Sequence, residues 1–166
     1  DSYGKKYKVD SFYSIDECLD KSDADFYAIA TPNYLHYEQS KKCIIKNKKV
    51  LIEKPATLRK KELEELINLA KENDTKVYCI LQVRLNNSVS VVKKCIDRNL
   101  LGKIRGASLI QRWQRPIEYF SGWRSIPEMG GGTLHEVGIH YIDIMQYLLG
   151  TPNISAAQVF NTKHSH

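Results

Sequence analysis

A lysine that follows a short apolar run is the first residue whose position could serve chemistry. The segment Lys49-Val-Leu-Ile-Glu53 is typical of a buried strand, and Lys54 and Pro55 follow it directly. A lysine held there by a proline enters the crevice at the end of a sheet, where it can donate a hydrogen bond to an alcohol oxygen that is losing its proton. The same spacing also suits a surface lysine in an ordinary turn, and taken alone it favours that interpretation.

A second constellation follows the glycine run 130–132. The sequence predicts a helix from about Thr133 to Leu149, on which Glu136, His140 and Asp143 share a face separate from the apolar stripe. Histidine exchanges protons near neutral pH, and a carboxylate one turn away can support the imidazolium, so His140 is a candidate general base. A buried structural histidine beside a carboxylate fits the pattern too. No metal is expected, because no third ligand stands at suitable spacing from Glu136 and His140.

Aromatic and basic residues gather in the loop between these two motifs. Flat aromatic rings stack on sugar or base faces, and arginine holds phosphate or carboxylate groups. The loop could therefore bind a substrate, although a packed loop or a subunit contact would have the same composition. Its residues are Arg112, Trp113, Arg115, Tyr119, Phe120, Trp123 and Arg124.

The first part of the chain is predicted to alternate between strands and helices, and these elements position Lys54 and the other residues at strand ends. Apolar runs predict strands at 25–30, 49–53 and 76–81, and periodic segments predict helices at 34–46, 59–72 and 88–98, after a short helix that a capping box opens at Ser14. This alternation indicates a parallel sheet covered by helices on both faces. Ligands of such sheets bind beyond the carboxyl ends of the strands. Thr31-Pro32-Asn33, Glu53-Lys54-Pro55 and Gln82-Val83-Arg84 should therefore meet at one edge.

The pattern changes after Gly102. A long strand is expected at 104–113, a loop at 114–128, the glycine-led helix after it, and a further strand from Ile154 to Phe160. We therefore expect an α/β fold in two domains. Residues 1–100 form part of a parallel sheet domain, and residues 101–166 begin a second domain of α+β type.

Charge and cysteine content narrow the class of protein. The net charge is +6, with a lysine-rich run from Lys41 to Lys49. No exposed aromatic partners or nucleic-acid module accompany these lysines, so we expect a solvated face and no nucleic-acid partner. No apolar run is long enough for a membrane span. The four cysteines are widely spaced, which favours buried thiols in a reducing compartment and thus the cytoplasm.

Taken together, three segments resemble the Gfo/Idh/MocA family of NAD(P)-dependent oxidoreductases. They are Ala30-Thr-Pro-Asn-Tyr-Leu-His36, Val50-Leu-Ile-Glu-Lys-Pro55, and the stretch from Gly130 to Asp143 that carries His140. The resemblance implies a Rossmann domain followed by an α+β domain with a mostly antiparallel sheet. The family's glycine-rich turn would lie before residue 1, so the chain would hold the C-terminal portion of the first domain and the N-terminal portion of the second.

The resemblance also implies roles for residues. Lys54 and His140 would be the catalytic pair in hydride transfer between a secondary alcohol and NAD or NADP. The cofactor would be lined by Thr31, Pro32, Asn33, His36, Glu53, Lys54, Trp123 and Arg124.

A sugar, sugar nucleotide or cyclitol is the substrate class that the resemblance implies. Glu136 stands where many members carry Asp, which leaves the exact substrate open. The residues expected to contact the substrate are Glu136, Arg84, Trp113, Arg115 and Tyr119. Homo-oligomers are expected as in other members. The alternative is a non-catalytic protein of the same fold that senses a dinucleotide or sugar, although such a protein needs neither Lys54 nor His140.

Overall fold

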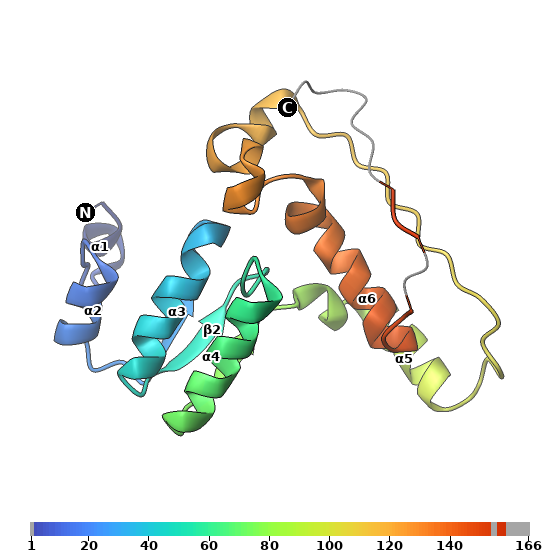
Figure 1. Cartoon of the computed structure of the whole chain (residues 1–166), viewed down its shortest axis with the longest axis horizontal. Coiled ribbons are helices and arrows are strands. Elements are labelled where there is room, and N and C mark those ends of the chain that lie inside the picture. Colours follow the sequence, from blue (N-terminus) through green and yellow to red (C-terminus); the bar gives the residue numbers. More distant parts are fainter. Residues whose placement is uncertain (1, 154–155, 159–166) are drawn as a thin grey trace. The chain divides into compact units, whose positions relative to one another are not determined.

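The computed structural model describes residues 2–153 and 156–158. The chain divides into two compact units, Asp1–Ile80 and Leu81–His166, and each is described here by itself. Figure 1 shows the course of the chain through its helices and strands. In the described ranges, every helix is too short or too polar to span a bilayer.

The first unit contains the parallel sheet that the sequence predicts. Its strands are β1 (Phe26–Ile29), β2 (Lys49–Ile52) and β3 (Val77–Cys79), in the order β1-β2-β3. All pairs are parallel, with Tyr27 opposite Val50 and Ile52 opposite Cys79. The connecting helices α3 (His36–Ile45) and α4 (Lys60–Glu72) begin and end within two residues of their predicted bounds, and they pack beside the sheet (Figure 1). The carboxyl ends of β1 and β2 therefore share one edge.

One face of this sheet forms the core of the first unit. Alternate strand residues point toward α3 and α4, where they pack on buried side chains of these helices. Each large aliphatic side chain buried there stabilises the fold by roughly 1.5–3 kcal/mol. The opposite face is open within this unit, with Phe26 and Tyr78 both more than half exposed. The core residues are Leu19, Tyr27, Ile29, Cys43, Ile44, Val50, Ile52, Leu66 and Ala70.

The four cysteines differ in their burial. Cys43 is fully buried, as expected, and burial raises the pKa of its thiol to about 11. Cys79 is exposed, contrary to the expectation of a buried thiol, because it lies at the end of β3, where the sheet has little cover within the unit. Cys18 and Cys95 are half-buried.

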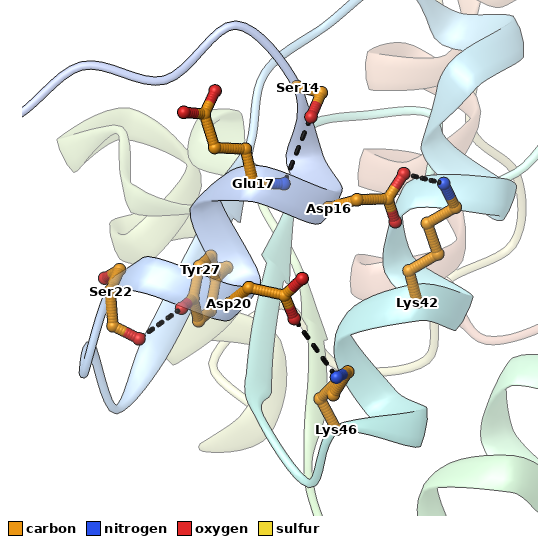
Figure 2. A network of polar contacts seen from close by, with 8 residues as sticks. All are labelled: Ser14, Asp16, Glu17, Asp20, Ser22, Tyr27, Lys42 and Lys46. Atoms are coloured by element: carbon orange, nitrogen blue, oxygen red, sulfur yellow. Dashed lines mark hydrogen bonds and ion pairs between the residues drawn. The ribbon is translucent and has the colours of Figure 1, made fainter.

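Ion pairs attach α2 (Ile15–Lys21) to α3, as Figure 2 shows. Asp16 pairs with Lys42 at 2.6 Å and Asp20 with Lys46 at 3.2 Å. The predicted cap is present, since the backbone N–H of Glu17 donates to the Ser14 hydroxyl at 3.1 Å (Figure 2). A short helix, α1 (Ser2–Tyr7), precedes these elements.

The lysine-rich run is thus partly neutralised by carboxylates. In addition to the pairs with Asp16 and Asp20, Lys41 donates to Glu65 on α4 at 2.7 Å. That hydrogen bond raises the pKa of Lys41 and lowers the pKa of Glu65. This pairing supports the expectation of a solvated face, and the absence of a nucleic-acid partner stays a prediction.

The second unit is helical and irregular in its described part. A single turn, η2 (Gln82–Leu85), leads into α5 (Asn87–Asp97). The short turns η3 (Ile117–Phe120), η4 (Gly122–Ser125) and η5 (Pro127–Met129) precede the glycine run. The predicted helix after the glycines opens with a wide π-helical turn, η6 (Leu134–Gly138), and continues as α6 (Ile139–Leu149).

The strand predicted at 104–113 was wrong, because the structure has irregular chain there. An extended segment becomes a strand only when a neighbour completes its hydrogen bonds, and none does so within the described residues. The further strand expected at 154–160 lies largely outside the described residues. The mostly antiparallel sheet therefore stays an expectation.

The boundary between the two compact units follows Ile80, about twenty residues before the expected domain division after residue 100. The difference concerns η2 and α5, which contact α6 of the second unit. The sequence places α5 in the first domain because its helical pattern continues the alternation with strands. Periodicity predicts a helix, but it does not say against which element that helix packs.

Candidate active site

The carboxyl edge of the first unit's sheet brings together the two predicted strand-end motifs. Thr31 and Pro32 follow β1, and the turn η1 (Asn33–Leu35) continues from them. Glu53 follows β2, and its backbone N–H donates to the Ile29 carbonyl at 2.9 Å, which joins the two strand ends. Lys54 is half-buried, and its backbone N–H donates to the Glu53 carboxylate at 3.3 Å.

A buried histidine, His36, contacts the backbone of both motifs. His36 begins α3 and is 1% exposed. Its Nδ1 lies 2.7 Å from the Pro55 carbonyl oxygen and its Nε2 lies 2.8 Å from the Thr31 carbonyl oxygen. The ring therefore contacts the backbone of both loops. The cofactor contact expected of His36 stays a prediction, as do those of Thr31, Pro32, Asn33 and Glu53.

In the second unit, three of the predicted site residues contact one another. Glu136, in the π-helical turn, is 7% exposed. Its carboxylate accepts a hydrogen bond from Nε of Arg124 at 3.1 Å and another from the Tyr119 hydroxyl at 3.4 Å. The long arm of Glu136 is thus held by η3 and η4. The substrate contacts expected of Glu136 and Tyr119 and the cofactor contact expected of Arg124 stay predictions.

The glycine run allows this close approach of η4 to the π-helical turn. A Cβ on Gly131 would lie 2.4 Å from the Arg124 carbonyl oxygen, a distance that the backbone cannot accommodate. The backbone N–H of Gly132 donates to the same carbonyl at 3.1 Å. The glycine run therefore lets the backbone of η4 approach closely.

The histidine predicted to be catalytic lies on the helix that follows. His140 is half-buried in the first turn of α6, one turn after Glu136, and its Nδ1 atom is buried. Lys54 belongs to the first unit and His140 to the second.

Arg84, predicted to contact the substrate, is engaged in an internal ion pair. Its Nε donates to Oδ2 of Asp143 at 2.8 Å, and its Nη2 donates to Oδ1 of the same carboxylate. The guanidinium also lies 4.9 Å from the centre of the Tyr147 ring. Asp143 is three residues after His140, so this pair fixes the helix that carries the histidine. The sequence placed Asp143 on the histidine's face but indicated no partner.

A pocket of about 570 Å³ opens beside the aromatic-basic loop, within the size range of small-molecule sites. The Arg115 guanidinium lies 4.4 Å from the centre of the Trp113 ring and 4.9 Å from that of Tyr119, so two flat rings hold it. The sequence does not predict that Gln111, Gln114, Thr133 and Val137 line a pocket, because such residue types have no pattern that is typical of a binding site. The pocket is lined by Gln111, Arg112, Trp113, Gln114, Arg115, Phe120, Thr133 and Val137.

Polar residues at the carboxyl edge of a parallel sheet stand where such sheets bind their ligands, as in dinucleotide-binding folds. Residues 2–81 match the family described as "Oxidoreductase family, NAD-binding Rossmann fold", and residues 89–166 match the "GFO/IDH/MocA C-terminal domain". The chain belongs to the Gfo/Idh/MocA oxidoreductase family.

Individual relatives act on sugars and cyclitols according to their names. The chain is 30% identical over 147 residues to the scyllo-inositol 2-dehydrogenase (NADP(+)) IolW of Bacillus subtilis, covering 89% of this chain and 41% of that protein. It is 30% identical over 138 residues to the 2,7-anhydro-N-acetylneuraminate hydratase of Escherichia coli, covering 82% of this chain and 37% of that protein.

A solved structure is similar over nearly the whole chain. The WlbA dehydrogenase from Bordetella pertussis, in complex with NADH and UDP-GlcNAcA, has a TM-score of 0.86 at 27% identity, covering 90% of this chain and 44% of that one. The chain thus spans about two-fifths of the length of the proteins that it matches.

Proposed function

We propose that the complete protein is an NAD(P)-dependent dehydrogenase that oxidises a secondary alcohol of a sugar-type substrate, with Lys54 and His140 as its catalytic pair. The observation that carries this proposal is the presence of both residues in their expected places, at the sheet edge and on the glycine-led helix of a Gfo/Idh/MocA chain. A relative named as a dehydrogenase of scyllo-inositol and a solved dehydrogenase in complex with NADH support it.

The residues of the sheet edge suit a nicotinamide. Ligands of parallel sheets bind beyond the carboxyl ends, where Thr31, Asn33 and Lys54 stand. NAD or NADP, when bound there, supplies the acceptor for the two electrons and the hydrogen that leave the alcohol carbon.

In the proposed mechanism His140 takes the hydroxyl proton of the substrate while the carbon loses its hydrogen with the bond electrons. The products are a ketone, the reduced dinucleotide and one proton, which His140 passes to solvent. Lys54 donates a hydrogen bond to the oxygen and stabilises its developing negative charge. A fixed donor is most effective where charge develops in the transition state. Glu136, held by Arg124 and Tyr119, stands one turn before His140, and its proposed role is to contact the substrate.

The aromatic-basic pocket is the proposed substrate site. Its arginines, Arg112 and Arg115, favour a substrate with a carboxylate or phosphate, and Trp113 offers a flat face to a sugar ring. WlbA, the solved relative, holds UDP-GlcNAcA, a ligand with both kinds of group. We therefore propose an acidic sugar or sugar nucleotide ahead of a neutral cyclitol.

The test is reduction of NAD and of NADP by the complete protein with a panel of hexoses, inositols, sugar phosphates and UDP-linked sugars. Lys54→Met and His140→Asn should abolish turnover and retain dinucleotide binding. Lys60→Met, which removes a lysine whose side chain is 88% exposed, is the matched control and should behave as wild type. Equal activity of the Lys54→Met protein would refute the catalytic pair.

The hydratase among the relatives provides a specific alternative outcome. Mass spectrometry of the products detects the addition of water to a sugar. Such an addition without accumulation of reduced dinucleotide would indicate a hydratase. Tight dinucleotide binding with no conversion of any sugar would indicate the non-catalytic sensor.

A further inference from the structure

We propose that His36 is a positioning residue that holds the Lys54 loop and the Thr31 loop in a fixed relation through contacts on both sides of its ring. This inference rests on the proposed function, in which Lys54 acts on the substrate oxygen and the Thr31 loop lines the nicotinamide. His36 itself touches neither ligand in this proposal.

The contacts of the ring define the bridge. Nδ1 lies 2.7 Å from the Pro55 carbonyl oxygen and Nε2 lies 2.8 Å from the Thr31 carbonyl oxygen. A carbonyl oxygen accepts hydrogen bonds and cannot donate, whereas a neutral imidazole carries a single N–H. The ring therefore donates to at least one of the two carbonyl oxygens, and its other nitrogen lies within hydrogen-bond distance of the second.

The helix that carries the ring is buried along this side. His36 is 1% exposed, and Ser40 and Cys43, further along α3, are fully buried as well. The helix packs on β1 and β2, the two strands that lead into the bridged loops. The ring thus transmits the position of a packed helix to both loops at once.

Each bridged carbonyl lies next to a residue of the proposed mechanism. Pro55 follows Lys54 directly, and Thr31 precedes Pro32 and Asn33 on the cofactor side. A displacement of about 1 Å between reacting groups can lower a rate by about 100-fold. Loss of the bridge should therefore lower kcat, since Lys54 must meet the developing charge in the transition state.

A direct cofactor contact would give a different result. If the His36 ring bound the dinucleotide, its removal would raise the KM and Kd of the dinucleotide and leave kcat at saturation near the wild-type value. The split between kcat and KM therefore distinguishes positioning from binding.

The experiment compares His36→Leu, which removes both ring nitrogens, with His36→Gln, whose single amide nitrogen restores one contact, in the complete protein. We expect His36→Leu to lower kcat by about 10- to 100-fold with little change in dinucleotide KM, and His36→Gln to lie between it and wild type. Glu38→Gln, an exposed change on the same helix, is the control and should leave kcat unchanged. Circular dichroism checks that each variant is folded.

A double-mutant cycle tests whether His36 acts through Lys54. In a Lys54→Arg background, which keeps a cation but moves it, His36→Leu should lower the remaining kcat by less than about 2-fold, because the position is already lost. Losses that multiply, or a loss confined to the dinucleotide KM, would overturn the inference.

Nitrogen NMR of labelled histidine separates this inference from the proposed function. If the wild-type protein oxidises no sugar, the proposed function fails. The NMR signals of the His36 ring still test whether the ring bridges the two loops. A ring N–H signal assigned to His36, by its loss in His36→Gln, that exchanges slowly with solvent supports this bridge. A His36 ring N–H that exchanges as fast as that of an exposed histidine refutes it.

Discussion

Nε of Arg124 lies 3.1 Å from Oε2 of Glu136, and the glutamate side chain is only 6% exposed. The pair joins η4 to the π-helical turn across the glycine run, and the Gly131 position leaves no space for a side chain between them. A buried carboxylate one turn before His140 is thus neutralised by a residue expected to bind cofactor.

Removal of this arginine should destabilise the second unit. Arg124→Met leaves the Glu136 carboxylate buried with only its remaining donors, at a cost of about 1–3 kcal/mol in the free energy of unfolding. Thermal unfolding of the complete protein measures the loss, with exposed Arg98→Met as the control. An unchanged melting temperature in Arg124→Met would show that the pair contributes nothing.

The ion pair between Arg84 and Asp143 predicts matched effects from its two partners. Arg84→Met and Asp143→Asn both loosen the attachment of α6 to η2, so both should lower kcat/KM to a similar extent, about 10- to 100-fold. Steady-state kinetics with the best substrate measures this. A rise in substrate KM that occurs in Arg84→Met alone would instead assign Arg84 to the substrate, as the sequence predicts.

The pocket predicts that Arg115 discriminates substrates by charge. Arg115→Met should raise the KM of substrates with a carboxylate or phosphate by about 10-fold or more, since a charge-assisted hydrogen bond contributes about 1.5–3 kcal/mol. Neutral hexoses and inositols should change by less than about 2-fold. Equal losses for acidic and neutral substrates would assign Arg115 to packing between Trp113 and Tyr119.

The buried thiol of Cys43 predicts a loss of stability at alkaline pH. Burial raises its pKa from the ordinary 9.0 to about 11 in the folded protein, so the native state holds the proton more tightly than the unfolded chain. The contribution is fully present below pH 9.0 and is lost as the pH rises through about 11. Denaturant unfolding of wild type and Cys43→Ala across this range measures it. The alanine variant should show the weaker decline, and parallel declines would contradict the assignment.

Several features of this protein follow from the sequence alone. The alternation of short apolar runs with amphipathic segments predicts the parallel sheet, because backbone periodicity is a local property that each segment carries by itself. The cap at Ser14 is local as well. The placement of Thr31 and Lys54 at one edge follows from parallel strand direction, which requires no knowledge of side-chain packing.

Tertiary structure decided which side chains meet. His36 reaches Pro55, 19 residues away, and Arg84 reaches Asp143, 59 residues away, and no spacing rule predicts such contacts. The predicted strand at 104–113 did not form, because a strand depends on a hydrogen-bonding neighbour as well as on its own pattern. Local periodicity therefore determined the elements and the edge of the site. The path of the chain between the elements determined the partners of each functional residue, because contacts between residues distant in sequence depend on how the whole unit packs.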